Sequence, residues 1–128
     1  GYRPDLVQAL AKALGARFVD FRKLKMAPLG WQAANLSLDV LTATAAEEMA
    51  QGSDVMLQNA EAMLSLVQRE DRESWFASAA SRVWPRRLIL PLTLFAHDLP
   101  HEMLDRVIEL RAEDLPSDGL LQRLAGLA

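Results

Sequence analysis

The sequence contains no cysteine and no long hydrophobic run. Without cysteine the chain has no disulfides, no thiolate zinc ligands and no thiol nucleophile. Its longest apolar stretch, residues 88–95, is interrupted by Pro91 and Thr93, and it is much shorter than the ~18–20 residues that cross a bilayer. We therefore expect a soluble, cytoplasmic protein with no membrane contact, stabilised by packing.

Two familiar catalytic patterns are also missing. The chain has no Gly-x-Gly-x-x-Gly fingerprint for dinucleotides and no Ser, His and Asp spacing suited to nucleophilic catalysis. Its 128 residues are 51% hydrophobic, which is enough for one compact core. We expect a single domain over residues 1–128, in which residues 112–128 form a C-terminal helical extension. The net charge of −3 argues against dominant attraction to nucleic acid or anionic lipid.

Helical and strand-like segments alternate along the chain. Apolar spacing and stop signals predict helices at residues 5–14, 39–51, 60–67, 72–83 and 118–127. Short β-branched, aromatic or apolar runs predict strands at residues 17–21, 53–58, 87–92 and 106–110. Residues 26–38 are expected to be a loop with one helical turn, and residues 68–71 a polar linker between two helices. The continuous apolar run 87–92 is typical of a central strand covered on both faces.

This alternation predicts an α/β fold. Helices that connect successive strands favour parallel pairing, and they cover both faces of a mostly parallel sheet in three layers. In such sheets a ligand binds at the carboxyl ends of the strands.

The order of these segments resembles that of P-loop NTPases. Residues 1–21 look like the phosphate loop, first helix and second strand of that family. Residues 53–64 are similar to its Walker B strand and following turn, and residues 87–95 resemble its sensor strand. Residues 97–127 are similar to the end of the α/β core in AAA-type ATPases. The resemblance covers most of the chain and implies a P-loop-like fold.

The phosphate-loop position departs from the family pattern. A working loop needs small residues, a lysine for the β- and γ-phosphates and a hydroxyl on Mg²⁺. Here the resemblance aligns Gly1, Tyr2, Arg3 and Asp5 with the loop, and Pro4 takes the place of the lysine. Proline lacks a backbone donor and Asp5 adds negative charge. We expect weak binding of ATP or ADP.

The Walker B position also departs from the pattern. An acidic pair at this strand end would hold Mg²⁺ and polarise water. The chain instead offers the neutral amides of Gln58 and Asn59, with Glu61 beyond them and Asp54 at the other strand end. A strand-end turn explains Gln58 and Asn59 equally well. With two motifs altered together, loss of hydrolysis is favoured.

Two groups of arginines have alternative interpretations. By the resemblance, Arg106 stands where an AAA-type arginine reaches a neighbour's nucleotide, although a solvated surface arginine is the favoured interpretation. Arg82, Arg86 and Arg87 are candidates for nucleic-acid contact, against the favoured alternative of a solvated edge. Residues 22–25 form a similar basic cluster, with Arg22, Lys23 and Lys25.

Histidines and tryptophans complete the candidates. His97 and His101 lie beside Asp98 and Glu102, a spacing that suits zinc only in a helix, which Pro100 opposes. We favour solvent-exposed turn histidines and expect no metal. Trp31, Trp75 and Trp84 are typical of core or interface anchors.

The resemblance raises a topological difficulty. In the family, the strand before the phosphate loop is central, between the sensor strand and the last strand. The sequence begins after that position, and a sheet with this gap would leave unpaired backbone groups. Either such a strand precedes residue 1, or the strand order differs from that of the family.

These observations lead to one hypothesis and two alternatives. The hypothesis is a non-catalytic P-loop or AAA-like module that acts by protein–protein interaction, with a protein partner or as a homo-oligomer. The resemblance permits a regulator or subunit in a bacterial ATP-dependent DNA-related or phage-defence system. The first alternative is an active AAA-type ATPase whose phosphate loop lies upstream of Gly1, with Glu61 or Asp54 at the metal. The second is a DNA-associated domain that uses the arginine cluster.

Overall fold

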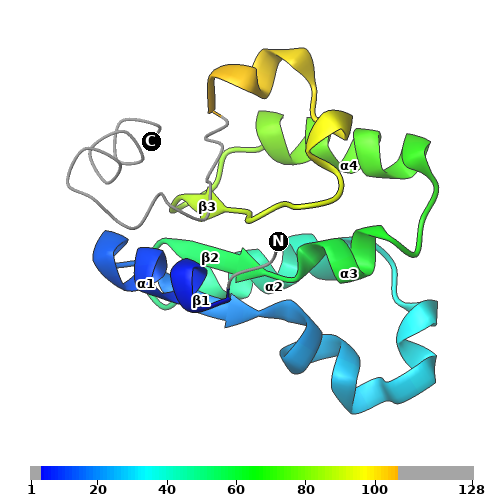
Figure 1. The fold of residues 1–128 in the computed structure, drawn as a ribbon, viewed down its shortest axis with the longest axis horizontal. Coiled ribbons are helices and arrows are strands. Elements are labelled where there is room, and N and C mark those ends of the chain that lie inside the picture. The colour runs from blue at the N-terminus through cyan, green and yellow to red at the C-terminus, as the bar shows by residue number, and fades with distance from the viewer. Residues whose placement is uncertain (1–3, 107–128) are drawn as a thin grey trace.

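The computed structural model describes residues 4–106 of the chain. Its α-helices and strands follow one another as α1 (Pro4–Leu14), β1 (Arg17–Asp20), α2 (Asp39–Met49), β2 (Val55–Gln58), α3 (Ala60–Leu64), α4 (Arg69–Ser81) and β3 (Leu88–Ile89), as Figure 1 shows. Short helical turns lie between them and after them: η1 (Arg22–Met26), η2 (Ala27–Asn35), η3 (Ala96–Asp98) and η4 (His101–Arg106).

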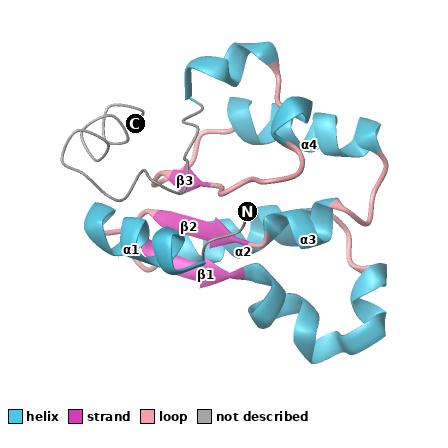
Figure 2. Cartoon of the chain, in the orientation of Figure 1, coloured by secondary structure: helices cyan, strands magenta, loops and turns pink. Residues whose placement is uncertain are grey.

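The strands form a small parallel sheet. Its order is β1-β2-β3, and both pairs are parallel. Arg17 pairs with Val55 and Asp20 with Gln58, while Val55 pairs with Leu88 on the other side of β2. The chain is therefore an α/β protein, in which helices flank an open three-stranded sheet within residues 4–106 (Figure 2), and this part of the expected fold is confirmed.

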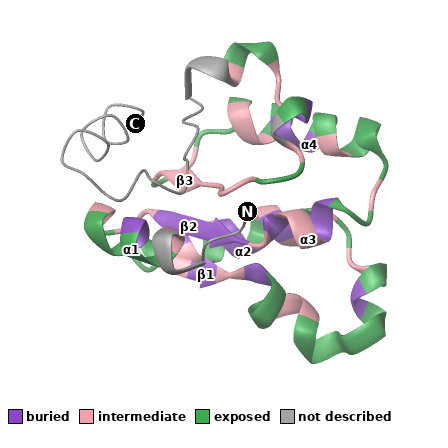
Figure 3. Cartoon of the chain, in the orientation of Figure 1, coloured by how far each residue is buried: buried purple, intermediate pink, exposed green. Residues whose placement is uncertain are grey.

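The central strand β2 separates two clusters of buried side chains. Alternate residues of a strand point to opposite faces, so Met56 packs with Leu10 and Ala11 of α1 on one face. On the other face, Val55 and Leu57 pack with residues of α2, α3 and α4. All four residues of β2 are buried, as Figure 3 shows. Burial on both faces explains why this strand is almost continuously apolar.

Several predicted boundaries are confirmed to within a few residues. The predicted helices 5–14 and 39–51 correspond to α1 and α2, and the strands 17–21 and 53–58 correspond to β1 and β2. Gly15 ends α1 with a φ of 69°, in the left-handed region that glycine tolerates best. One detail differs, because Pro4 already belongs to α1 and Asp5 therefore lies inside the helix.

The strand expected at residues 87–92 is much shorter than predicted. Only Leu88 and Ile89 pair, and both are half-buried. Within residues 4–106, β3 lies at the edge of the sheet and has β2 as its strand neighbour. Pro91 has no N–H to donate, which limits any continuation of the ladder.

Two other segments are more helical than expected. Most of residues 26–38 belong to η2, which has a kink at Gly30 (φ 58°, ψ −132°), a conformation that other residues rarely adopt. In the polar run 68–71, Gln68 is extended, and the three residues after it form the first turn of α4. Glu70 and Asp71 suit this first turn because they complement the helix dipole. The preceding helix, α3, is correspondingly shorter than predicted.

The C-terminal expectations are only partly covered by the structure. Arg106 was expected to open a strand at residues 106–110, but it ends η4 instead. The remainder of that strand, the helix 118–127 and the extension 112–128 lie outside the described residues, as do Gly1, Tyr2 and Arg3. None of the helices between residues 4 and 106 is long and apolar enough to span a bilayer.

Candidate functional site

The carboxyl ends of the three parallel strands meet at one edge of the sheet. Asp20 ends β1, Gln58 ends β2, and the segment 90–95 follows β3. In parallel α/β sheets this edge is where ligands bind. It is therefore the candidate functional site.

Asn59 connects the first two strands at this edge. Its side-chain Nδ2 donates to Asp20 Oδ1 at 3.0 Å, and the backbone N–H of Lys23 donates to the same oxygen at 3.2 Å. Asn59 itself has a φ of 64°, which asparagine tolerates better than most residues. The residue thus forms the turn between β2 and α3 and fixes the position of one Asp20 oxygen.

Gln58 is nearly inaccessible to solvent. Its exposed fraction is 3%, and its Oε1 has no hydrogen-bond partner in the structure. A neutral amide oxygen can accept a hydrogen bond, but it cannot neutralise a divalent cation. Gln58 is therefore poorly suited to hold Mg²⁺ at this strand end.

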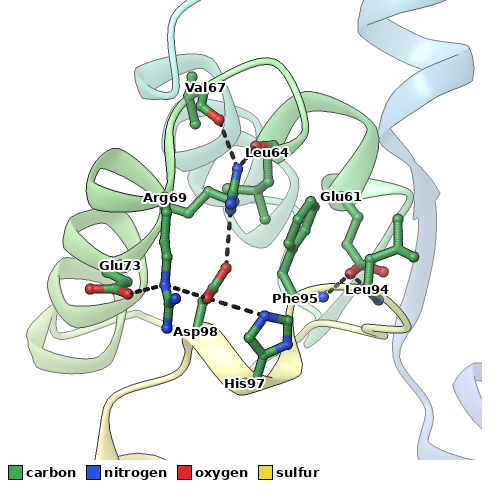
Figure 4. A network of polar contacts seen from close by, with 10 residues as sticks. Glu61, Leu64, Val67, Arg69, Glu73, Leu94, Phe95, His97 and Asp98 are labelled. Carbon is green, nitrogen blue, oxygen red and sulfur yellow. Dashed lines mark hydrogen bonds and ion pairs between the residues drawn. The ribbon is translucent and has the colours of Figure 1, made fainter.

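Glu61 points to the segment after β3 instead of an open site. Its Oε1 accepts from the backbone N–H of Thr93 at 2.6 Å and from the Thr93 hydroxyl at 3.1 Å. Its Oε2 accepts from the backbone N–H groups of Leu94 at 2.6 Å and Phe95 at 2.8 Å. Figure 4 shows the carboxylate beside this backbone. Charge-assisted bonds of this kind hold both oxygens in place.

A second carboxylate, Asp98, holds η3 against α4. Its side chain is fully buried, and its Oδ2 accepts from Arg72 Nε at 3.1 Å. Its Oδ1 lies 3.2 Å from Arg69 Nε, as an ion pair without hydrogen-bond geometry, and 3.5 Å from His97 Nε2. These groups are drawn in Figure 4. Two arginines offset the cost of burying this charge.

Arg72 extends this cluster into the surrounding backbone. Its Nη1 donates to the carbonyl of Val67 at 2.7 Å, and its guanidinium lies 4.2 Å from the Phe95 ring centroid. Phe95 also donates its backbone N–H to Glu61. The Glu61 and Asp98 contacts therefore fix opposite ends of the same segment, residues 93–98.

The histidines that suggested zinc do not gather with other ligands. His97 is mostly exposed and its nearest acidic partner is Asp98, which already has two arginines. His101 and Glu102 are exposed. In the described part of the chain, no group of three or more His, Cys, Asp or Glu side chains is arranged to hold a metal ion.

The arginine cluster lies away from the carboxyl edge. Arg87 precedes β3, where its Nε donates to Asp54 Oδ2 at 3.0 Å and its backbone N–H donates to Oδ1 at 2.9 Å. Arg82 lies over the Trp84 ring at 4.9 Å, and Arg86 is exposed. Much of this positive charge is thus engaged within the protein, which reduces what is available to a phosphate backbone.

Asp54 begins the ladder at the opposite edge from the candidate site. Burial disfavours its charged form, yet hydrogen bonds from the backbone and side chain of Arg87 favour it, as do the charges of Arg87 and Arg86. Together these interactions hold the pKa of Asp54 below its ordinary value. Asp54 is therefore a partner of Arg87 at the amino end of β2. Asn59 follows the other end of this strand, so Asp54 cannot serve a metal there.

Three features of this edge were not expected from the sequence. The contact between Asp20 and Asn59 could have been predicted, because both follow strands that a parallel sheet places side by side. The backbone donors at 93–95 carry no side-chain signature. The pairing of Arg72 with Asp98 depends on where η3 packs, which no periodicity indicates.

Arg106 and Asp5 both lie in helical elements. Arg106 belongs to η4, and Asp5 belongs to α1, while Gly1, Tyr2 and Arg3 precede the described range.

In comparisons with known proteins, no family, no curated protein and no solved structure matches this chain.

Proposed function

We propose that this protein is a non-catalytic, P-loop-like module that acts by binding another protein chain, as a regulator or subunit beside an active ATPase. The support begins with the sheet. The strands that resemble the second, Walker B and sensor strands are all present and parallel. Within residues 4–106, the sensor-like strand β3 lies at an edge of the sheet.

The observation that carries the non-catalytic part is the environment of Glu61. A carboxylate that holds Mg²⁺ or activates water needs an oxygen directed at the ligand. Both oxygens of Glu61 accept backbone hydrogen bonds from Thr93, Leu94 and Phe95. With neutral Gln58 and Asn59 beside it, the part of this edge that the structure describes offers Mg²⁺ no pair of uncommitted carboxylates.

The interaction part is supported by exposed apolar side chains. Trp31 is 83% exposed, and Leu24 and Leu29 of the same segment are also exposed. Large apolar groups on a surface are typical of protein-binding sites, and tryptophan is among the commonest energetic anchors there. A module without hydrolysis would exert its effect through such surfaces.

Calorimetric titration with Mg·ATP and Mg·ADP tests the proposal. We expect no saturable binding up to about 1 mM nucleotide, a limit that corresponds to roughly −4 kcal/mol. Phosphate release should equal that of buffer. Magnesium-dependent micromolar affinity together with turnover would overturn the non-catalytic assignment and support the active-ATPase alternative.

The variant Glu61→Gln makes this test sharper. If Glu61 polarised a catalytic water, the variant would bind ATP and lose turnover. On the present proposal it changes neither nucleotide binding nor phosphate release, because its effect is on the segment 93–95. Glu47→Gln is the matched control, since Glu47 is an exposed glutamate of α2 away from the edge.

A further inference from the structure

The segment between β1 and α2 has a charge unlike that of the rest of the chain. Residues 21–38 contain Arg22, Lys23 and Lys25 and no acidic residue. They hold three of the 14 basic residues and none of the 17 acidic ones, which leaves a net charge of −6 on the remainder. Such a separation favours contact with a surface of negative potential.

This segment also presents an unpartnered tryptophan. Residues 27–32 are all exposed, and Trp31 is among the most exposed large apolar side chains. Leu24 and Leu29 are exposed as well. Figure 1 shows η1 and η2 extending away from the sheet at the lower right. We call residues 22–32 the basic tip.

A second surface has the complementary character. A hollow of about 420 Å³ lies between residues 37–39 and the α3–α4 region. Its apolar lining comes from Leu38, Val67 and Trp75, and its charges are the carboxylates of Asp39 and Asp71. The serines 37, 74 and 78 complete the lining, which includes no lysine or arginine. We call this surface the acidic hollow.

The charges on both surfaces are available. None of the ion pairs among residues 4–106 involves Arg22, Lys23 or Lys25. The same ion pairs do not involve Asp39 or Asp71. A contact between the two surfaces would therefore form new ion pairs without breaking existing ones.

We propose that the basic tip of one copy of this chain docks in the acidic hollow of a second copy. The indole of Trp31 would cover the Leu38, Val67 and Trp75 floor, while the basic side chains approach Asp39 and Asp71. An aromatic anchor in an apolar pocket with charged surroundings is the usual anatomy of an interface hot spot. A second copy brings both surfaces in equal number.

A nucleic acid is the less suitable occupant. Its phosphates would suit the basic tip, and its bases would stack on Trp31. It would leave the acidic hollow unused, however, and the −6 charge on the rest of the chain would repel it. The second copy accounts for both surfaces with one contact.

This inference deepens the interaction part of the proposed function and rests on it. The two can fail separately. Nucleotide turnover would overturn the non-catalytic assignment and leave self-association as it is, whereas a protein that stays monomeric would overturn only the inference made here.

The test is a complementation experiment on the full chain by sedimentation equilibrium. Wild-type protein should associate, and Trp31→Ala should weaken association by about thirtyfold or more, as for a buried aromatic anchor. Ser74→Arg, which fills the hollow and offsets part of its negative charge, should do the same. An equimolar mixture of the two variants should associate again, because the first retains its hollow and the second its tip.

Matched controls separate docking from folding. Val83→Ala removes another exposed apolar side chain, and Ala77→Arg adds an arginine to α4 outside the hollow. Both should associate like wild type, and all four variants should have wild-type circular dichroism. Association should also weaken as salt rises.

Three outcomes would overturn the proposal: a monomeric wild type at millimolar concentration, a mixture of Trp31→Ala and Ser74→Arg that stays monomeric, or controls that weaken association as much as the test variants. Salt-sensitive binding of a single-stranded oligonucleotide by a monomeric protein, lost in Trp31→Ala, would assign the basic tip to nucleic acid instead.

Discussion

Glu61 connects two segments that are distant in sequence. Its carboxylate lies in α3 and accepts hydrogen bonds from the segment after β3, more than 30 residues later. Three of these bonds come from consecutive backbone N–H groups, which converge on one negative charge. These backbone donors form an anion-binding site, which we call the nest, and an internal carboxylate occupies it.

We predict that Glu61→Gln destabilises the protein by about 1–3 kcal/mol. The amide keeps one accepting oxygen but brings an NH₂ group toward backbone donors, which leaves part of the nest unsatisfied. Urea unfolding followed by circular dichroism measures the change. Glu47→Gln serves as the control and should lie within about 0.5 kcal/mol of wild type. Equal stabilities for the two variants would contradict this role of Glu61.

For single residues, the sequence predicts the position within an element better than it predicts the burial or the hydrogen-bond partners of the side chain. Gln58 and Asn59 could be predicted to lie at a strand end, because an asparagine after an apolar run is typical of a turn. The burial of Gln58 could not, since it depends on neighbouring elements. Nor could the partners of Glu61 be predicted, because backbone donors are present at every position except proline.

Among elements, α4 and η3 are held together by a buried carboxylate. Asp98 lies between Arg72, which is largely buried, and Arg69, which is largely exposed. Arg69 also pairs with Glu73 one turn along α4, and that pair is exposed. The same helix therefore offers a buried and a surface ion pair for comparison.

We predict that Asp98→Asn costs about 3 kcal/mol and Glu73→Gln less than about 0.5 kcal/mol. Removing Asp98 leaves the buried charge of Arg72 without its partner, whereas an exposed pair contributes little. Guanidinium chloride unfolding measures both. Comparable costs for the two variants would show that Asp98 is more solvated than its burial indicates.

The amino ends of β2 and β3 are joined by Asp54 and Arg87. Because the pKa of Asp54 is lowered in the folded protein, its contribution is fully present above the unfolded pKa near 3.8. The contribution is lost as pH falls below 3.8 through the lower, folded value. Stability conferred by this carboxylate is therefore a property of neutral and mildly acidic solution.

We predict that Asp54→Asn is less stable than wild type at pH 7, and that the difference narrows toward pH 2. The variant cannot ionise, so it lacks the pH-dependent contribution at every pH. Urea unfolding at a series of pH values gives the difference directly. A gap of constant size would mean that the pKa of Asp54 is not lowered by Arg87.

The prediction of strands succeeded for β2, which is buried on both faces. It was less successful for residues 87–92, where few residues pair with a neighbouring strand. The run Val55-Met56-Leu57 is apolar because helices cover both faces of β2. The run at residues 87–92 has a similar composition, yet only Leu88 and Ile89 pair. An apolar composition indicates that a segment is buried. Leu90 and Leu92 are half-buried because they pack against the main cluster, although they do not join the sheet. Pattern alone does not separate the two cases.

On the scale of the whole molecule, residues 4–106 cover the two faces of the sheet unequally. The cluster that includes Leu41 contains twelve buried residues, from α2, α3, α4, β1, β2 and the position of Phe21 just after β1. On the other face, within residues 4–106, three buried residues make the cluster under α1, and Leu10 is one of them. Regions with fewer buried apolar contacts open at lower free energy. The face covered by α1 should therefore open before the rest of the protein unfolds.

We predict that Leu41→Ala destabilises the whole protein, whereas Leu10→Ala destabilises chiefly α1. Leu41→Ala leaves a cavity in the main cluster, so it should lower global stability by about 3 kcal/mol and accelerate hydrogen exchange in β2, α2 and α3 together. Leu10→Ala should accelerate exchange chiefly in α1 and leave the amides of β2 that face Arg17–Asp20 protected. If Leu10→Ala accelerates exchange throughout the molecule, α1 belongs to the same cooperative unit as the main cluster, and unequal burial on the two faces does not translate into unequal stability.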